Sequence, residues 1–201
     1  MNQIVRIDGR NCFVEVVKKA MSLKAKNSEG KIQLNFVRYD GQTKKQTGFG
    51  SFYFSFKEWF VLDDYIRKGE FVDDYVAAKT EQARTGESYA SPVKQYYKGT
   101  VSQGQVISRV LQLIPGNKDN TLVLALAQGP GEQTREGLIK PAGKPAQTIS
   151  VPMALDDMIG MIKLVDQEIQ AHKTGEEVYR VLDERFARLE QMIDQVSRKM
   201  D

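Results

Sequence analysis

Cysteine and histidine are almost absent from this chain of 201 residues, which contains one of each. A single cysteine, Cys12, cannot form an internal disulfide framework, and its apolar neighbours in the sequence predict a small buried side chain. The lone histidine, His172, leaves too few ligands for a structural zinc site or for metal catalysis. The composition therefore fits a reducing, cytoplasmic setting and predicts no metal cofactor.

Long hydrophobic runs and the common catalytic motifs are missing as well. No apolar segment approaches the roughly 20 residues that cross a bilayer, and the amino terminus lacks the pattern of a signal peptide. No phosphate-binding glycine loop or dinucleotide motif occurs. A serine nucleophile would have only His172 as its base. Adjacent carboxylates such as Asp63 and Asp64 point about 100° apart on a helix, which is typical of a solvated face. We expect neither enzymatic activity nor a cofactor.

The charges are distributed unevenly along the chain, although the formal net charge is only +3. Residues 1–60 contain 11 Lys and Arg against 5 Asp and Glu, whereas residues 152–201 contain 7 against 11. A local positive excess of this size attracts polyanions, and binding of that kind weakens as the salt concentration rises. The amino-terminal third is therefore the candidate region for contact with a nucleic acid.

Residues 31–66 have the most informative pattern, which predicts a strand, a turn, a second strand and a capped helix. Because side chains alternate along a strand, Ile32, Leu34 and Phe36 share one face of the first strand. In the second strand, predicted over 47–56, Phe52, Phe54 and Phe56 lie together. One face of this antiparallel sheet is therefore apolar and has to be covered by other elements.

The opposite face combines cations, amides and aromatic rings, which is what a single-stranded oligonucleotide requires for its phosphates and bases. A polar face that is merely solvated is the alternative. Strict alternation would place Arg38 on the apolar face, so only its position near the end of the strand lets its guanidinium reach solvent. The candidate contacts are Lys31, Gln33, Asn35, Arg38, Tyr39, Lys44, Lys45, Phe49 and Tyr53.

The rest of the chain predicts a second sheet followed by a helix. Ser55 and Glu58 form a capping box that begins the first helix, and residues 70–100 are expected to connect two modules, 1–69 and 101–172. In the second module we expect strands over 105–114, 121–127, 137–140 and 148–151. We also expect Gly129-Pro130-Gly131 to interrupt the strand structure, and a helix from Pro152 to Ala171. The fold class is therefore α+β, with two tandem antiparallel-sheet-plus-helix modules in one pseudo-symmetric unit.

Residues 173–201 predict a further, amphipathic helix with a seam close to a heptad repeat. Such a helix packs on its own domain or pairs with a second copy or another protein. This leaves a structural or adaptor protein as the alternative function. The seam consists of Val178, Leu182, Phe186, Leu189, Ile193 and Val196.

The order of sheet and helix, repeated in one chain, resembles the single-strand nucleic-acid binders of the Whirly, Pur-repeat and transcriptional positive-coactivator type. The residues that match best are Ser55-Phe-Lys-Glu-Trp59 after the strand that ends near Phe54. The resemblance implies largely sequence-independent binding of single-stranded DNA, or of RNA, on a sheet face. The small size of the chain and the missing enzyme motifs favour a role of such a protein in replication, recombination or transfer of phage or mobile DNA. Of the 18 aromatic residues, 16 lie at or before Tyr97 and none lies between 98 and 178. We therefore expect the first module to bind and the second to act as scaffold.

Overall fold

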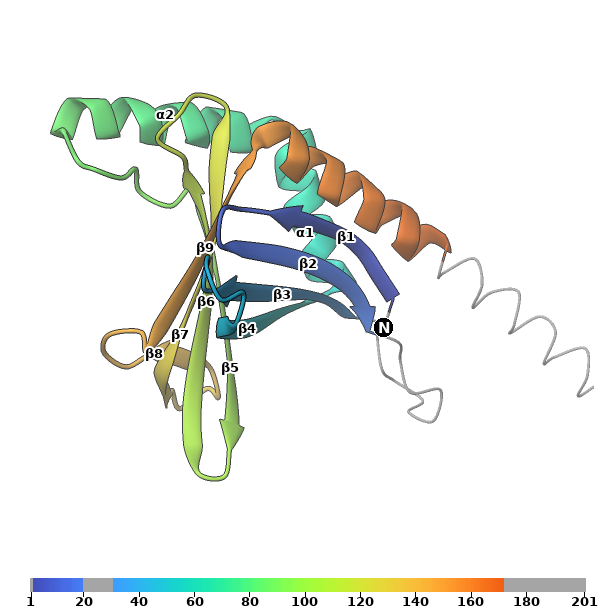
Figure 1. Cartoon of the computed structure of the whole chain (residues 1–201), viewed down its shortest axis with the longest axis vertical. Coiled ribbons are helices and arrows are strands. Elements are labelled where there is room, and N and C mark those ends of the chain that lie inside the picture. The colour runs from blue at the N-terminus through green and yellow to red at the C-terminus, as the bar shows by residue number, and fades with distance from the viewer. Residues whose placement is uncertain (1, 20–30, 172–201) are drawn as a thin grey trace, which may run out of the picture. The chain divides into compact units, whose positions relative to one another are not determined.

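The computed structural model describes residues 2–19 and 31–171, which form an α+β fold with two antiparallel sheets (Figure 1). The fold class predicted from the sequence is confirmed at this level. A final helix covers residues 155–171. The other elements are β1 (Asn2–Asp8), β2 (Cys12–Lys19), β3 (Lys31–Tyr39), β4 (Gln46–Ser55), α1 (Phe56–Arg67), α2 (Glu70–Thr85), β5 (Lys94–Ser102), β6 (Gln105–Pro115), β7 (Thr121–Gln133), β8 (Ile139–Pro141) and β9 (Gln147–Ala154).

The first sheet consists of β1, β2, β3 and β4 in that order, and every neighbouring pair is antiparallel. The predicted alternation is confirmed, because Ile32, Leu34 and Phe36 are fully or almost fully buried. Val14 and Val16 of β2 pair with Phe36 and Leu34 and extend the same buried face. Burial of this apolar area is the main contribution that fixes the register of the sheet.

Helix α1 begins at the predicted capping box. The Ser55 hydroxyl accepts the Glu58 backbone N–H at 3.3 Å, and the Glu58 carboxylate accepts the Ser55 N–H at 2.8 Å. The cap ends β4 at Ser55, so Phe56 is the first helical residue and not a strand residue as predicted. The helix buries Trp59 and Leu62 against the first sheet, where the Trp59 ring meets the Phe54 ring edge-on with centroids 5.6 Å apart.

The other Glu58 oxygen forms an ion pair with Lys98 of β5. One carboxylate therefore caps α1 and also links this helix to the second sheet. Burial alone would raise the pKa of Glu58, but the Lys98 ammonium and the Ser55 N–H and hydroxyl lower it below its usual value. The ionised carboxylate is consequently the form that the fold favours.

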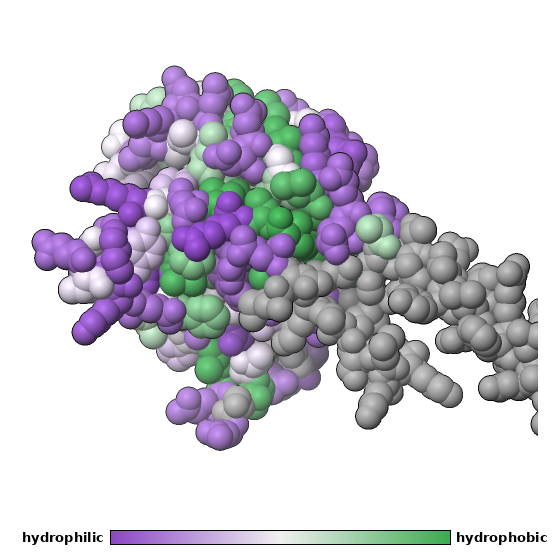
Figure 2. Space-filling model, turned by 45° about the vertical axis from the view of Figure 1, so that its right-hand side comes forward, coloured by the Kyte–Doolittle hydropathy of each residue, from purple (hydrophilic) through white to green (hydrophobic). Residues whose placement is uncertain are grey.

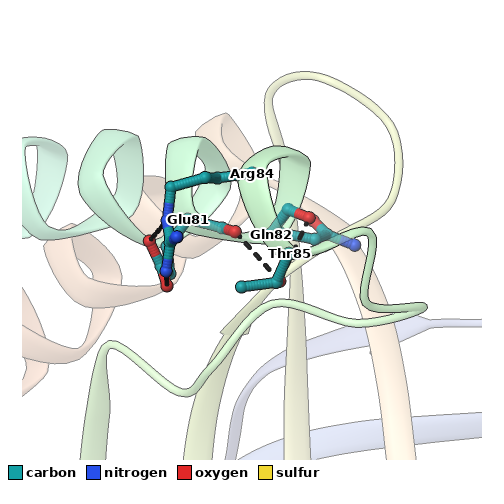
Figure 3. A network of polar contacts seen from close by, with 4 residues as sticks. All are labelled: Glu81, Gln82, Arg84 and Thr85. Carbon is teal, nitrogen blue, oxygen red and sulfur yellow. Dashed lines mark hydrogen bonds and ion pairs between the residues drawn. The ribbon is translucent and has the colours of Figure 1, made fainter.

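Helix α2 follows after Gly69, whose φ of 84° is in the left-handed region that glycine adopts without strain. Its last turn is held by side chains as well as by the backbone (Figure 3). Arg84 forms two short hydrogen bonds with the Glu81 carboxylate, at 2.7 and 2.5 Å, and the Thr85 hydroxyl donates to the Glu81 carbonyl oxygen at 3.0 Å. Gly86 then ends the helix in a left-handed cap.

The second sheet contains β5, β6, β7 and β8 in that order, and β9 pairs with β7. The stretch over 70–100, expected to connect the two modules, contains α2 and most of β5. Two residues with positive φ, Gln103 and Gly104, make the tight turn from β5 to β6. β5 begins before residue 101 and adds Tyr96 and Tyr97 to the second sheet, although the predicted module 101–172 contains no aromatic residue.

Two predictions based on proline are also wrong. Gly129-Pro130-Gly131 does not interrupt the strand, because β7 continues to Gln133. At this tripeptide β7 changes partners: its ladder with β9 covers Thr121 to Gln128, and its ladder with β8 begins at Gly131. Pro152 lies in β9 and does not open the last helix, which covers 155–171. Among the strands of residues 2–19 and 31–171, β9 pairs with β7 alone, and such an edge position tolerates a residue without an N–H.

The strands of the two sheets cross in Figure 1, and β9 contacts all four strands of the first sheet. Three hydrogen bonds join them: the Cys12 thiol donates to the Ser150 carbonyl at 3.2 Å, Arg38 Nη1 to the Thr148 carbonyl at 3.4 Å, and Gln147 Nε2 to the Phe49 carbonyl at 2.6 Å. The second sheet contributes buried side chains to the core, which are Leu111, Leu113, Leu122, Leu124, Leu126, Ile149, Val151 and Met153.

The boundary between two compact units falls after Lys163, so the second unit contributes only residues 164–171 to the described part of the chain. In the first unit, the last helix buries Met158, Met161 and Ile162. Within residues 2–19 and 31–171, no helix combines the length and the apolar character needed to cross a bilayer.

Candidate nucleic-acid interface

The face of the first sheet that points away from the core is called the outer face here. The strand register places its side chains in cross-strand rows. One row contains Asp8, Phe13, Val37 and Phe49, and the next contains Arg6, Glu15, Asn35 and Ser51. A third row includes Val17, Gln33 and Tyr53. The outer face is therefore a mixture of aromatic, amide and charged groups, and not a uniformly charged surface.

Most of the predicted contacts lie on this face or at its ends. Lys31 is exposed at one end of β3, and Lys44 and Lys45 are exposed in the hairpin at the other end. Gln33, Tyr39 and Tyr53 are half-buried, whereas Phe49 is 47% exposed. The side of the molecule shown in Figure 2 has hydrophobic residues in patches among hydrophilic ones. The structure thus brings rings and cations to one sheet.

Asn35 differs from the other candidates because it is buried and both the nitrogen and the oxygen of its carboxamide are hydrogen-bonded. Its amide nitrogen donates to the Glu15 carboxylate at 3.0 Å. Its oxygen accepts the Ser51 hydroxyl at 2.8 Å and the Gln33 amide at 2.6 Å. A buried amide with its partners in place does not exchange them for a ligand without cost. Asn35 therefore holds Gln33 and Ser51 in position, and it is not presented as a direct contact.

The aromatic rings on the outer face differ in what already covers them. The Arg6 guanidinium lies 3.7 Å from the centre of the Phe13 ring, in cation–π geometry. The Lys44 ammonium is 5.6 Å from the centre of the Tyr39 ring. Phe49 is the most exposed of the large hydrophobic side chains on this face. Its backbone is held in place because its carbonyl accepts the Gln147 amide.

Carboxylates on the outer face are paired with donors. Asp8 accepts Arg6 at 2.6 Å, and Glu15 accepts the Asn35 amide. In the hairpin, Asp40 accepts the backbone N–H groups of Thr43 and Gln42 and the Thr43 hydroxyl. These hydrogen bonds, first that of the Thr43 N–H, lower the pKa of Asp40. They also shape the turn that projects Lys44 and Lys45.

Arg38 lies on the opposite face from Gln33 and Tyr53, as strict alternation predicts. Its guanidinium is exposed and reaches the Thr148 carbonyl of β9. Arg38 is therefore at the edge of β9, beside the outer face and not on it. The seam residues from Val178 to Val196 lie outside the described residues, and so does His172.

Sequence reasoning missed Arg6, Phe13 and Glu15, because no strand register was predicted for the residues before Lys31. Alternation within Phe13-Val14-Glu15-Val16 was the signal that could have placed them. Residues 2–19 and 31–171 contain no group of three or more His, Cys, Asp or Glu side chains that could hold a metal ion. Comparison of the sequence with protein-family models and with curated proteins gives no match.

Proposed function

We propose that this chain binds single-stranded DNA, largely without sequence preference, through the outer face of the first sheet. The observation that carries the proposal is the exposed Phe49 ring on a sheet face that ends in the exposed cations Lys44 and Lys45. An exposed phenylalanine on a rigid strand offers a stacking surface to any base, and nearby ammonium groups attract the phosphates. Half-buried Tyr53 and Tyr39 extend the aromatic surface.

The order of elements supports the same proposal. Four strands and α1 are followed by a second set of strands and the helix over 155–171. We propose that the two modules are pseudo-symmetric, as the resemblance to Whirly and Pur-repeat proteins implies. In such a fold the second module packs against the core-facing side of the first sheet, which leaves the outer face for the ligand.

Fluorescence titration of a labelled oligonucleotide tests the proposal directly. The wild-type chain should bind single strands more tightly than duplex, and the affinity should fall as salt is added. Log K falls linearly with log salt, and the magnitude of this negative slope should decrease by about 0.7 for each phosphate contact removed. A combined Lys44→Gln and Lys45→Gln variant should therefore have a slope that is shallower by about 1.4.

The aromatic contact is tested with Phe49→Ala. Stacking contributes about 1–3 kcal/mol per base, so we expect an affinity loss of roughly 5- to 150-fold. Tyr89→Ala is the matched control, because Tyr89 is also an exposed ring, at 70% exposure, but lies in the loop after α2. Absence of wild-type binding at low salt would refute the proposal, and so would equal losses in the two variants.

A further inference from the structure

A groove of about 310 Å³ lies on the face of the second sheet that points away from the core. Tyr97, Val110, Ala127 and Thr148 pair in register across β5, β6, β7 and β9 and form one cross-strand row in its floor. Its wall comes from Pro141 at the end of β8 and from Gly143 and Pro145 in the chain between β8 and β9. We call it the Tyr97 groove.

The chemistry of the Tyr97 groove fits a nucleobase. The Tyr97 ring is 55% exposed, and its hydroxyl donates to the Gln95 side-chain oxygen at 2.8 Å, which fixes the orientation of the ring. Ala127 and Val110 give a flat apolar floor, while Gln95 and Gln112 supply amide donors and acceptors. A base requires this combination of a stacking surface and hydrogen-bonding groups for its edge.

The electrostatics of the groove also favour a nucleic acid. None of the side chains that line it in the described part of the chain is a carboxylate. Lys144 lies between the lining residues Gly143 and Pro145 and is exposed. Its exposed ammonium is available to a phosphate beside the groove while a neighbouring base occupies the floor.

β9 connects the groove with the outer face of the first sheet. Thr148 lines the groove, and its carbonyl accepts Arg38 of β3. The preceding residue, Gln147, holds the Phe49 carbonyl. The exposed Arg38 side chain therefore lies at the strand edge between the two surfaces, one residue before Tyr39 and close in sequence to the lysines of the hairpin.

We propose that the Tyr97 groove is a second nucleobase subsite. The DNA strand bound on the outer face of the first sheet passes Arg38 at the edge of β9, and Tyr97 then stacks on one of its bases. This rests on the proposed function of the first sheet. It assigns the second module a binding role in place of a purely supporting one. Short oligonucleotides fill the outer face alone, and longer ones reach the groove as well.

The experiment compares wild type, Phe49→Ala, Tyr97→Ala and the control Tyr89→Ala over a length series of labelled oligothymidines. Tyr97→Ala should bind long oligonucleotides roughly 5- to 150-fold more weakly and short ones unchanged. Phe49→Ala should weaken both. Tyr97→Phe keeps the ring and should retain most of the affinity for long strands. Thermal unfolding of each variant checks that the fold is intact.

The outcomes separate the two proposals. Wild-type binding together with a Tyr97→Ala variant that matches it at every length would overturn the subsite and leave the proposed function standing. Equal weakening by Tyr97→Ala and Tyr89→Ala would also overturn it, since that loss would not be specific to the groove. No binding by the wild type overturns both. Photo-crosslinking of an iodouracil-containing oligonucleotide should label the peptide with Tyr97; labelling confined to the first sheet would contradict the subsite.

Discussion

Glu58 offers the sharpest test of how the two sheets are held together. Its carboxylate caps α1 through Ser55 and pairs with Lys98 of β5. Loss of the half of the capping box that the Glu58 side chain supplies costs up to about 1 kcal/mol, because the Ser55 hydroxyl keeps its own bond to the backbone N–H of residue 58. The ion pair adds less than about 1 kcal/mol, because both side chains are 37% exposed and solvent screens the attraction. Glu58→Ala should therefore lower the unfolding free energy by up to about 2 kcal/mol, and the melting temperature of a chain of this size by up to about 8 °C.

The pH dependence of this effect has a definite sign. The pKa of Glu58 is lowered in the folded chain from its ordinary value of 4.5. Its contribution to stability is therefore complete above that value and is lost as the pH falls through the lower folded pKa. The difference in melting temperature between wild type and Glu58→Ala should be largest near neutral pH and should shrink in acid.

Differential scanning calorimetry across a pH series measures both effects. Lys98→Met removes only the ion pair and should cost less than Glu58→Ala, while Glu87→Gln changes an exposed carboxylate elsewhere and serves as the control. Equal melting temperatures for wild type and Glu58→Ala at neutral pH would refute the dual role. A difference that stays constant in acid would refute the assignment of the effect to the ionised carboxylate.

Three further predictions concern the second sheet and the thiol. A Cβ at Gly99 would lie 2.4 Å from the Ile139 side chain, so Gly99→Ala should lower the urea midpoint by the equivalent of about 1–3 kcal/mol. Gly160→Ala, which meets nothing within 4 Å, should not lower it. Burial raises the pKa of Tyr96 to about 12, so stability should decline as the pH rises above 10, and less in Tyr96→Phe, as alkaline melting curves would show. Burial also raises the pKa of Cys12, so a thiol reagent should label it more slowly in the folded chain than in urea.

The elements that sequence reasoning predicted correctly are those whose signal is local. Alternation identified the buried face of β3 and β4, and the Ser55 and Glu58 pair identified the start of α1. Both depend on residues within a few positions of each other. The exposure of Phe49 follows from the same alternation.

The elements that were missed depend on distant partners. β5 contains Gly99 and few alternating apolar residues, and it forms a strand because β6 offers a complete antiparallel ladder. Proline at 130 and 152 was read as a break and as a helix start. Pro130 is compatible with a strand because it lies at the end of the ladder between β6 and β7. Pro152 is compatible with a strand because β9, within the described part of the chain, pairs with β7 on one side and has a free edge on the other. Asn35 was predicted as a contact because it lies on the polar face of β3, whereas the partners that engage its amide, Glu15 and Ser51, come from neighbouring strands.

The position of β9 late in the sequence affects how the chain folds during its synthesis. This strand bonds to the first sheet through residue pairs that are 138, 110 and 98 positions apart in the sequence. A nascent chain that has not yet emerged as far as residue 154 therefore lacks a strand that every one of its first four strands contacts. Pairings this distant in sequence slow folding. We expect the amino-terminal module to stay protease-sensitive on the ribosome until β9 has been released.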